Sequence, residues 1–138
     1  MSKTILEVGI EREAIVCDII AQQLNPISIE RNKTRGIDII ADMIKIEVKS
    51  AQSIVKSNKR KRRGRFNMTK KEIGRADYFA FFIKYKRDYE VYFVDVKHLR
   101  DLAANRGERF SLTIPQLFRL PRKLNLRKLI LEAEEGGK

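Results

Sequence analysis

The chain of 138 residues has the length of one domain with a substantial core, and 43% of its residues are hydrophobic. It has no apolar run of membrane-spanning length, and its first residues reach an acid too early for a secretory signal, so we expect a cytoplasmic protein. Cys17 and His98 are the only cysteine and histidine, which excludes a zinc centre or a disulfide framework and leaves little room for Ser-His-Asp catalysis. Any catalysis must therefore depend on carboxylates and lysines.

The first half of the chain predicts one helix and three strands. Apolar residues at helical steps predict a helix over 5–24 that ends at Asn25-Pro26, with Cys17 as a small core residue. Alternating or β-branched residues predict strands over 27–31, 36–41 and 44–49. Asp42-Met43 is the right length for a tight hairpin turn between the second and third strands.

The second half predicts helices on both sides of a strand pair. Thr69 and Glu72 form a capping-box pattern at the start of a short helix. Residues 78–83 are typical of a buried strand and 90–96 of another. Helices are expected over 97–106, near Pro115 and over 124–134. The order α-β-β-β-α-β-β-α predicts a single α/β domain in which helices flank a mixed sheet.

The positive charge is concentrated in one part of the chain. The net charge is +12, and residues 45–75 hold twelve basic residues against two acidic ones. Residues 56–65 include seven basic residues and are expected to form a loop that binds a polyanion, with nucleic acid favoured. An anionic membrane is disfavoured because this run lacks an apolar face, whereas a solvated charge run remains an alternative. The candidate DNA-binding residues are Arg35, Lys56, Lys59, Arg60, Lys61, Arg62, Arg63, Arg65 and, for base or sugar contact, Phe66.

Acidic and basic side chains on the predicted hairpin suggest a metal-dependent reaction. Glu47 and Lys49 share one face of the third strand, and Asp38 is an isolated acid across the hairpin. Two neighbouring carboxylates suit a hard cation such as Mg²⁺, and a nearby lysine is suited to stabilising charge on a phosphate. The alternative is an ordinary half-exposed strand whose Glu and Lys face water.

These residues resemble the PD-(D/E)XK nuclease superfamily, most nearly the archaeal Holliday junction resolvases. The likeness covers residues 8–50 by motif and the rest by element order, and it rests on Gly9-Ile10-Glu11-Arg12-Glu13, Ile37-Asp38-Ile39-Ile40-Ala41 and Ile46-Glu47-Val48-Lys49. The chain departs from the family pattern in having Ile rather than Pro before Asp38, and in its more basic run over 56–65.

The resemblance implies a restriction-endonuclease-like core and a Mg²⁺-dependent DNA endonuclease, with Mn²⁺ able to substitute and no organic cofactor. Glu11, Asp38 and Glu47 would bind the metal, and Lys49 would be the catalytic lysine. Because one such domain covers about one turn of duplex, symmetric cutting of both strands favours a homodimer. Its candidate surface is Leu124, Leu126, Leu129 and Ile130. Alternatives are a restriction-like or repair nuclease acting on linear or single-stranded DNA, and a non-catalytic nucleic-acid-binding protein.

Overall fold

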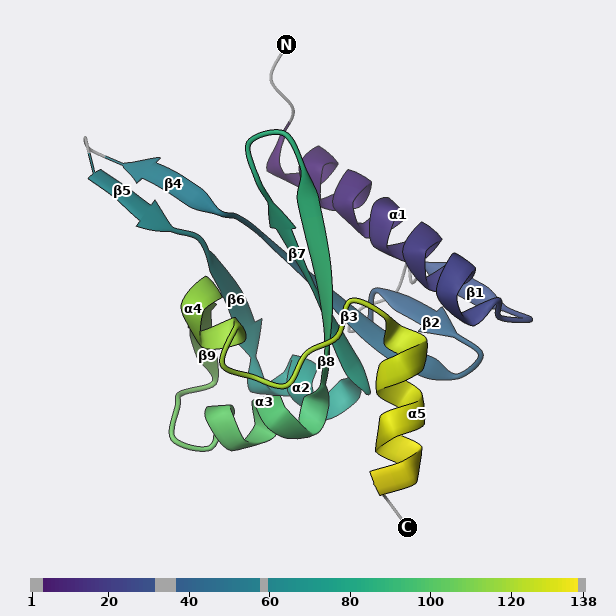
Figure 1. The fold of residues 1–138 in the computed structure, drawn as a ribbon. Coiled ribbons are helices and arrows are strands. Elements are labelled where there is room, and N and C mark those ends of the chain that lie inside the picture. Colours follow the sequence, from purple (N-terminus) through teal and green to yellow (C-terminus); the bar gives the residue numbers. More distant parts are fainter. Residues whose placement is uncertain (1–3, 32–36, 58–59, 137–138) are drawn as a thin grey trace.

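The computed structural model describes residues 4–31, 37–57 and 60–136 (Figure 1). Its helices are α1 (Ile5–Leu24), α2 (Lys70–Arg75), α3 (Val96–Ala103), α4 (Ile114–Leu117) and α5 (Leu126–Gly136). Its strands are β1 (Ile29–Arg31), β2 (Ile39–Ala41), β3 (Ile44–Gln52), β4 (Ile54–Ser57), β5 (Arg60–Arg63), β6 (Arg65–Thr69), β7 (Tyr78–Lys84), β8 (Tyr89–Asp95) and β9 (Arg109–Thr113).

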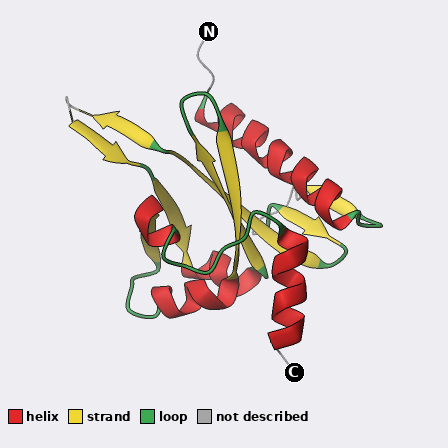
Figure 2. Ribbon diagram, viewed as in Figure 1, coloured by secondary structure: helices red, strands yellow, loops and turns green. Residues whose placement is uncertain are grey.

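Among the described residues, five strands form a mixed sheet in the order β1-β2-β3-β7-β8. The β3–β7 pair is parallel, and the other neighbours are antiparallel. Helices flank this sheet (Figure 2), so the predicted fold class is confirmed. The sequence did not predict the two smaller strand pairs, β4–β5 and β6–β9, which occupy much of the connection between β3 and α2 and the segment after α3.

The predicted hairpin turn joins β2 to β3. Asp42 and Met43 both have positive φ, at 46° and 74°, as a two-residue turn with the twist of the flanking strands requires. Asp42 has a second role, because its carboxylate accepts hydrogen bonds from the backbone N–H groups of Ile27 and Ser28 at 3.0 and 2.8 Å. The turn therefore also holds residues 27 and 28, which immediately precede β1.

Each face of the sheet has its own hydrophobic core. Residues of β7 alternate between them, since Phe79 and Phe81 belong to one core and Ala80 and Phe82 to the other. Val16 and Ile20 of α1 and Leu126 and Leu129 of α5 complete the core on the Phe82 side. The core on the Phe79 side is completed by α2, α3, α4 and the β6–β9 pair, through Ile73, Leu99, Leu117, Phe66 and Leu112.

The burial of α5 corrects the expected dimer surface. Leu126 and Leu129 are buried within the chain's own core, so they are not available to a second copy. Leu124 is exposed and Ile130 is half-buried. Among the described helices, none combines the length and the apolar character needed to cross a bilayer.

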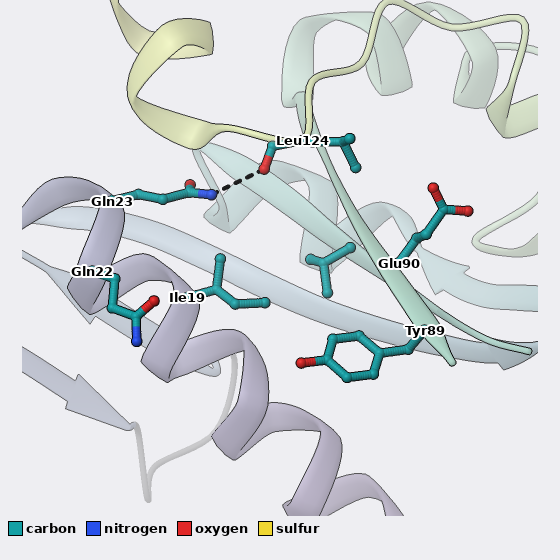
Figure 3. Close-up of a pocket in the computed structure, with 7 residues that line it drawn as sticks. Ile19, Gln22, Gln23, Tyr89, Glu90 and Leu124 are labelled. Carbon is teal, nitrogen blue, oxygen red and sulfur yellow. Dashed lines mark hydrogen bonds between the residues drawn. The ribbon is translucent and has the colours of Figure 1, made fainter. Parts of the chain in front are cut away.

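Gln23 of α1 fastens the start of α5. Its amide nitrogen donates to the carbonyl oxygen of Leu124 at 3.0 Å, and its amide oxygen accepts from the N–H of Leu126 at 2.7 Å. Figure 3 shows the first of these bonds at the edge of a pocket of about 390 Å³ that is lined by α1, β8 and Leu124. One side chain thus satisfies both a loop carbonyl and an N–H of the first helical turn.

We predict that Gln23→Ala lowers the free energy of unfolding by about 1–2 kcal/mol, because two hydrogen bonds of a partly buried amide are lost. Urea denaturation measures this change. Gln22→Ala is the matched control, because Gln22 lines the same pocket but is exposed. Equal destabilisation by the two variants would contradict the role given to Gln23.

Candidate active site and nucleic-acid interface

The site is built on β3, where Glu47 and Lys49 point to the same side of the sheet. They are two residues apart, opposite Phe79 and Phe81 of β7, so they face the α2 side rather than the α1 side. Because helices or strand pairs cover both faces, Glu47 is only 6% exposed. The predicted shared face is confirmed, and the alternative of a Glu that simply faces water is wrong for Glu47.

Asp38 lies immediately before β2 rather than within it, which corrects the expected strand bounds. Its Oδ2 accepts a hydrogen bond from the backbone N–H of Val48 at 2.8 Å. The β2–β3 register pairs Ile39 with Ile46, so Asp38 comes beside Glu47 at the end of the hairpin. The two carboxyl groups are close enough for Asp38 to act on the ionisation of Glu47.

This contact determines the ionisation of Glu47. Burial, the hydrogen bond to the Asp38 carboxyl and the negative charge of Asp38 together raise the pKa of Glu47 to about 10, against the opposing charge of Lys49. Glu47 therefore carries a proton at neutral pH when no cation is bound. A carboxyl pair of this kind is ready to exchange that proton for a cation.

Glu72 of α2 joins the site and was not among the predicted site residues. Lys49 Nζ lies 2.5 Å from Glu72 Oε2 and 4.0 Å from Glu47 Oε1. Glu72 also closes the capping box of α2, where its carboxylate accepts from Thr69 N–H at 2.8 Å. Burial raises the pKa of Glu72, but its bonds to Lys49 and Thr69 outweigh this, so the pKa lies below its ordinary value. The capping-box pattern in the sequence predicted that Glu72 lies in the first turn of a helix, but it did not predict the contact with Lys49.

Among the acids of α1, Glu13 is more buried than Glu11. Val16 and Ile20 are the fully buried residues of the helix, and Glu13, three residues before Val16, is half-buried on that side. Burial and the nearby charge of Asp38 raise the pKa of Glu13, and its 3.2 Å bond to Arg31 opposes this. Glu11 is exposed, and its role as a metal ligand stays a prediction.

The carboxyl pair fits a cation that keeps most of its water. In the described ranges, no three acidic, cysteine or histidine side chains are grouped so as to hold a metal ion. A closed cage of protein ligands is therefore not built into these residues. Mg²⁺ is commonly bound by only one or two carboxylates, with waters and substrate phosphates as its other ligands. Asp38 and Glu47 are the oxygen donors that suit this mode of binding.

The basic run forms a ribbon, not the predicted loop. Antiparallel β4 and β5 make an arm that extends away from the helices (Figure 1), and their register places Lys56 opposite Lys61 and Val55 opposite Arg62. We call β4 and β5, residues 54–57 and 60–63, the basic arm. Sequence reasoning missed this ribbon because a run of Lys and Arg has no hydrophobic alternation.

Gly64 fixes the base of the basic arm. A Cβ at this position would lie 1.9 Å from the carbonyl oxygen of Gln52, so only glycine permits this approach of the backbone. Gly64 N–H donates to the carbonyl of Ser53, and Ser53 N–H donates to the carbonyl of Lys84 on β7, at 3.2 and 2.8 Å. The arm is thereby tied to the central sheet.

The structure places the predicted DNA-binding residues in different environments. Phe66 is 0% exposed and packs edge-on against Phe81 with ring centroids 4.8 Å apart, so its expected contact with a base or sugar is wrong. Arg63 and Arg65 are exposed. The strands of the arm include Lys56, Arg60, Lys61 and Arg62. Arg35 and Lys59 lie outside the described residues.

Arg12, next to Glu11 on α1, supports the sheet. Its guanidinium donates to Ser50 Oγ at 3.1 Å and lies over the Phe82 ring at 5.5 Å from the centroid. Partial burial lowers the pKa of Arg12. These contacts hold α1 against β3 on the face opposite Glu47.

No protein-family model, curated protein or solved structure matches the chain.

We predict that Glu47→Gln reduces the pH dependence of stability in metal-free solution. Because the native pKa is about 10 and the ordinary value is 4.5, native Glu47 keeps its proton between these limits while the unfolded chain loses it. The native state then binds more protons, so stability falls as the pH rises through this window. Glutamine preserves a hydrogen-bond donor without titrating.

Thermal unfolding of the wild type and Glu47→Gln at pH 5 and pH 9 measures the difference. We expect the melting temperature of the variant to exceed that of the wild type by roughly 5 °C or more at pH 9, and by less at pH 5. An identical pH dependence of the two proteins would contradict the assignment of a protonated Glu47.

Proposed function

We propose that this protein is a metal-dependent endonuclease of the PD-(D/E)XK type. The observation that carries the proposal is the contact between Asp38 and the buried Glu47, with Lys49 4.0 Å from Glu47 on the same strand. A buried carboxyl group beside a second, half-buried one and an amine is costly in a protein that only binds nucleic acid, and it has a clear use in phosphodiester hydrolysis.

Within that class, we propose that the protein acts on branched DNA as a Holliday junction resolvase. This narrower proposal rests on the resemblance of residues 8–50 to the archaeal resolvases. The homodimer expected for paired, symmetric cutting is part of it.

The residues of the site divide the work between them. Asp38 and Glu47 would hold Mg²⁺, which when bound polarises the scissile phosphate and makes a coordinated water more acidic. Lys49 is placed to stabilise negative charge on the phosphate or to orient the attacking water. Glu72 is a positioning residue, since its carboxylate directs the amine of Lys49 and is itself held by the cap of α2.

The basic arm supplies the electrostatic part of binding. Between Ile54 and Arg63 the sequence has six basic residues and no acid. A two-stranded ribbon is narrow enough to enter the major groove of B-form DNA, and its charge favours contact with the phosphates on both sides. Because β3 leads directly from Lys49 into the arm, duplex held by the arm lies close to the proposed site.

We predict that Asp38→Asn and Lys49→Ala each lower Mg²⁺-dependent DNA cleavage by at least about a hundredfold, because the first removes a metal ligand and the second the charge next to the phosphate. The assay uses labelled four-way junction, linear duplex, single-stranded DNA and RNA, each with Mg²⁺ or with chelator. Asp101→Asn is the matched control, because Asp101 is exposed on α3.

The products separate the alternatives. Paired symmetric nicks in the junction alone support a resolvase, whereas cutting of linear or single-stranded DNA as well supports a broader nuclease. Salt-sensitive binding without cleavage under any divalent ion would leave a non-catalytic binding protein. Wild-type cleavage rates in Asp38→Asn would refute the proposed site.

We predict that shortening the basic arm weakens DNA binding chiefly at low salt. Replacing residues 55–62 by Asn-Gly removes five basic residues and keeps Gly64 and the base of the arm. If most of these residues contact phosphates, the slope of log affinity against log salt becomes shallower by roughly 2–4. Fluorescence anisotropy with labelled duplex at several salt concentrations measures it.

The control removes the charges of Arg127 and Lys128, which are exposed on α5, by substitution with glutamine. It should change the salt slope much less than arm shortening does. An unchanged slope after arm shortening would contradict the role given to the arm.

A further inference from the structure

The β6–β9 pair has a polar face on the side away from its buried residues. Alternation along the two strands places their core residues on one side and six polar residues on the other. We call these six residues the polar face: Arg65, Asn67 and Thr69 of β6, and Arg109, Ser111 and Thr113 of β9. Because cross-strand partners project to the same side, the register makes Asn67 a neighbour of Ser111 and Thr69 a neighbour of Arg109.

The polar face runs from the base of the basic arm to the proposed catalytic site. Arg65 directly follows Gly64, where β5 continues into β6 (Figure 1). At the other end, the Thr69 hydroxyl lies 3.2 Å from the Glu72 carboxylate that contacts Lys49. A groove of about 560 Å³ at this end is lined in part by Lys49, Glu72 and four of the six polar-face residues. A DNA strand that passes from the arm to Lys49 therefore crosses this face.

The polar face presents mainly hydrogen-bond donors. Arg65 and Arg109 are exposed, and within the described residues neither side chain makes an ion pair or a hydrogen bond. Ser111 Oγ donates to Asn67 Oδ1 at 3.2 Å, which engages the amide oxygen and leaves the amide nitrogen to donate. A DNA phosphate offers only acceptor oxygens, whereas base edges present donors as well. The face thus suits the sugar-phosphate backbone better than the bases.

The charge at the catalytic end of the face also favours a phosphate. The Glu72 carboxylate is matched by Lys49 at 2.5 Å, so Arg109 leaves the lining of the groove with a net positive charge. Glu108, the acid next to Arg109 in the sequence, is engaged at the start of α2, where its carboxylate accepts from Lys71 N–H at 3.2 Å. The guanidinium of Arg109 is therefore suited to an external anion.

We propose that the polar face holds the phosphate backbone of the DNA strand between the basic arm and Lys49, with Arg109 as the contact nearest the scissile phosphate. This inference rests on the proposed nuclease function and names a substrate contact outside the arm. From Arg65 to Thr69 the face spans about 13 Å, whereas successive phosphates of one strand are about 3.4 Å apart along the helix axis. It can therefore reach more than one phosphate. Such contacts position the strand without reading its sequence.

The salt dependence of binding tests the contact at Arg109. Affinities for two duplexes of unrelated sequence are measured with chelator present, so that no DNA is cut. We expect Arg109→Gln to make the slope of log affinity against log salt shallower by about one with both duplexes, and Arg109→Lys to keep the wild-type slope. Arg127→Gln is the matched control, because Arg127 is exposed on α5, which packs on the opposite face of the sheet. Melting temperatures confirm that each variant is folded.

Arginine modification in the wild-type protein separates backbone from base contact. Phenylglyoxal reacts with accessible guanidinium groups, and mass spectrometry gives the rate at each arginine. We expect a duplex and an abasic deoxyribose-phosphate strand both to slow the modification of Arg109 several-fold, and neither to affect Arg127. Protection by the duplex but not by the abasic strand would assign Arg109 to a base and contradict the inference.

Cleavage of modified DNA locates the contact along the strand. With Mg²⁺, a single neutral methylphosphonate is placed at successive positions around the cut. At one position next to the scissile phosphate it should slow the wild type roughly tenfold but slow Arg109→Gln no further, because the variant has already lost that charge-assisted contact. Equal slowing of both proteins at every position would show that Arg109 does not contact these phosphates.

The outcomes distinguish this inference from the proposed function. An unchanged salt slope in Arg109→Gln, or modification of Arg109 that DNA does not slow, would overturn the inference even if the protein cleaves DNA with Mg²⁺. Failure to cleave any substrate would refute the nuclease proposal, whereas the slope and the modification rates would still decide whether the polar face binds the DNA backbone.

Discussion

The contact between the Asp38 and Glu47 carboxyl groups is the constraint on which the account depends. Glu47 is buried because both faces of the central sheet are covered, and Asp38 is brought beside it by the register of a tight hairpin. Burial and, after it, the neighbouring Asp38 carboxyl raise the pKa of Glu47 to about 10. A bound cation would remove this conflict, so the fold keeps in place a pair of oxygen ligands that is most stable either protonated or metallated.

The other proposed functional residues lie near the Asp38–Glu47 pair because of the path that the chain takes after β3. From Lys49 the chain continues through β3 to the basic arm, returns through Gly64 to β6, and reaches Glu72 at the start of α2. Glu72 then contacts Lys49, so the end of the segment that connects β3 to α2 lies beside β3, where the segment began. One insertion between the central strands thus carries both the proposed duplex contact and the residue that orients the lysine.

The sequence predicted the elements with strong periodicity and missed those that depend on distant partners. The helix over 5–24, the hairpin at Asp42-Met43 and the buried strand from Tyr78 were predicted because apolar spacing and turn length are local signals. Phe66 was assigned to DNA because its neighbours are basic, but its partner Phe81 is fifteen residues away and fixes it in the core. Glu72 was missed as a site residue since only the packing of α2 beside β3 brings it to Lys49.

Calorimetric titration of the protein with Mg²⁺ tests the central claim most directly. Repeating the titration at pH 8 in two buffers of different ionisation enthalpy gives the number of protons released on binding. We predict saturable Mg²⁺ binding with release of about one proton, and loss of both in Asp38→Asn. Absence of binding, or binding that releases no proton and is unaffected by Asp38→Asn, would contradict it.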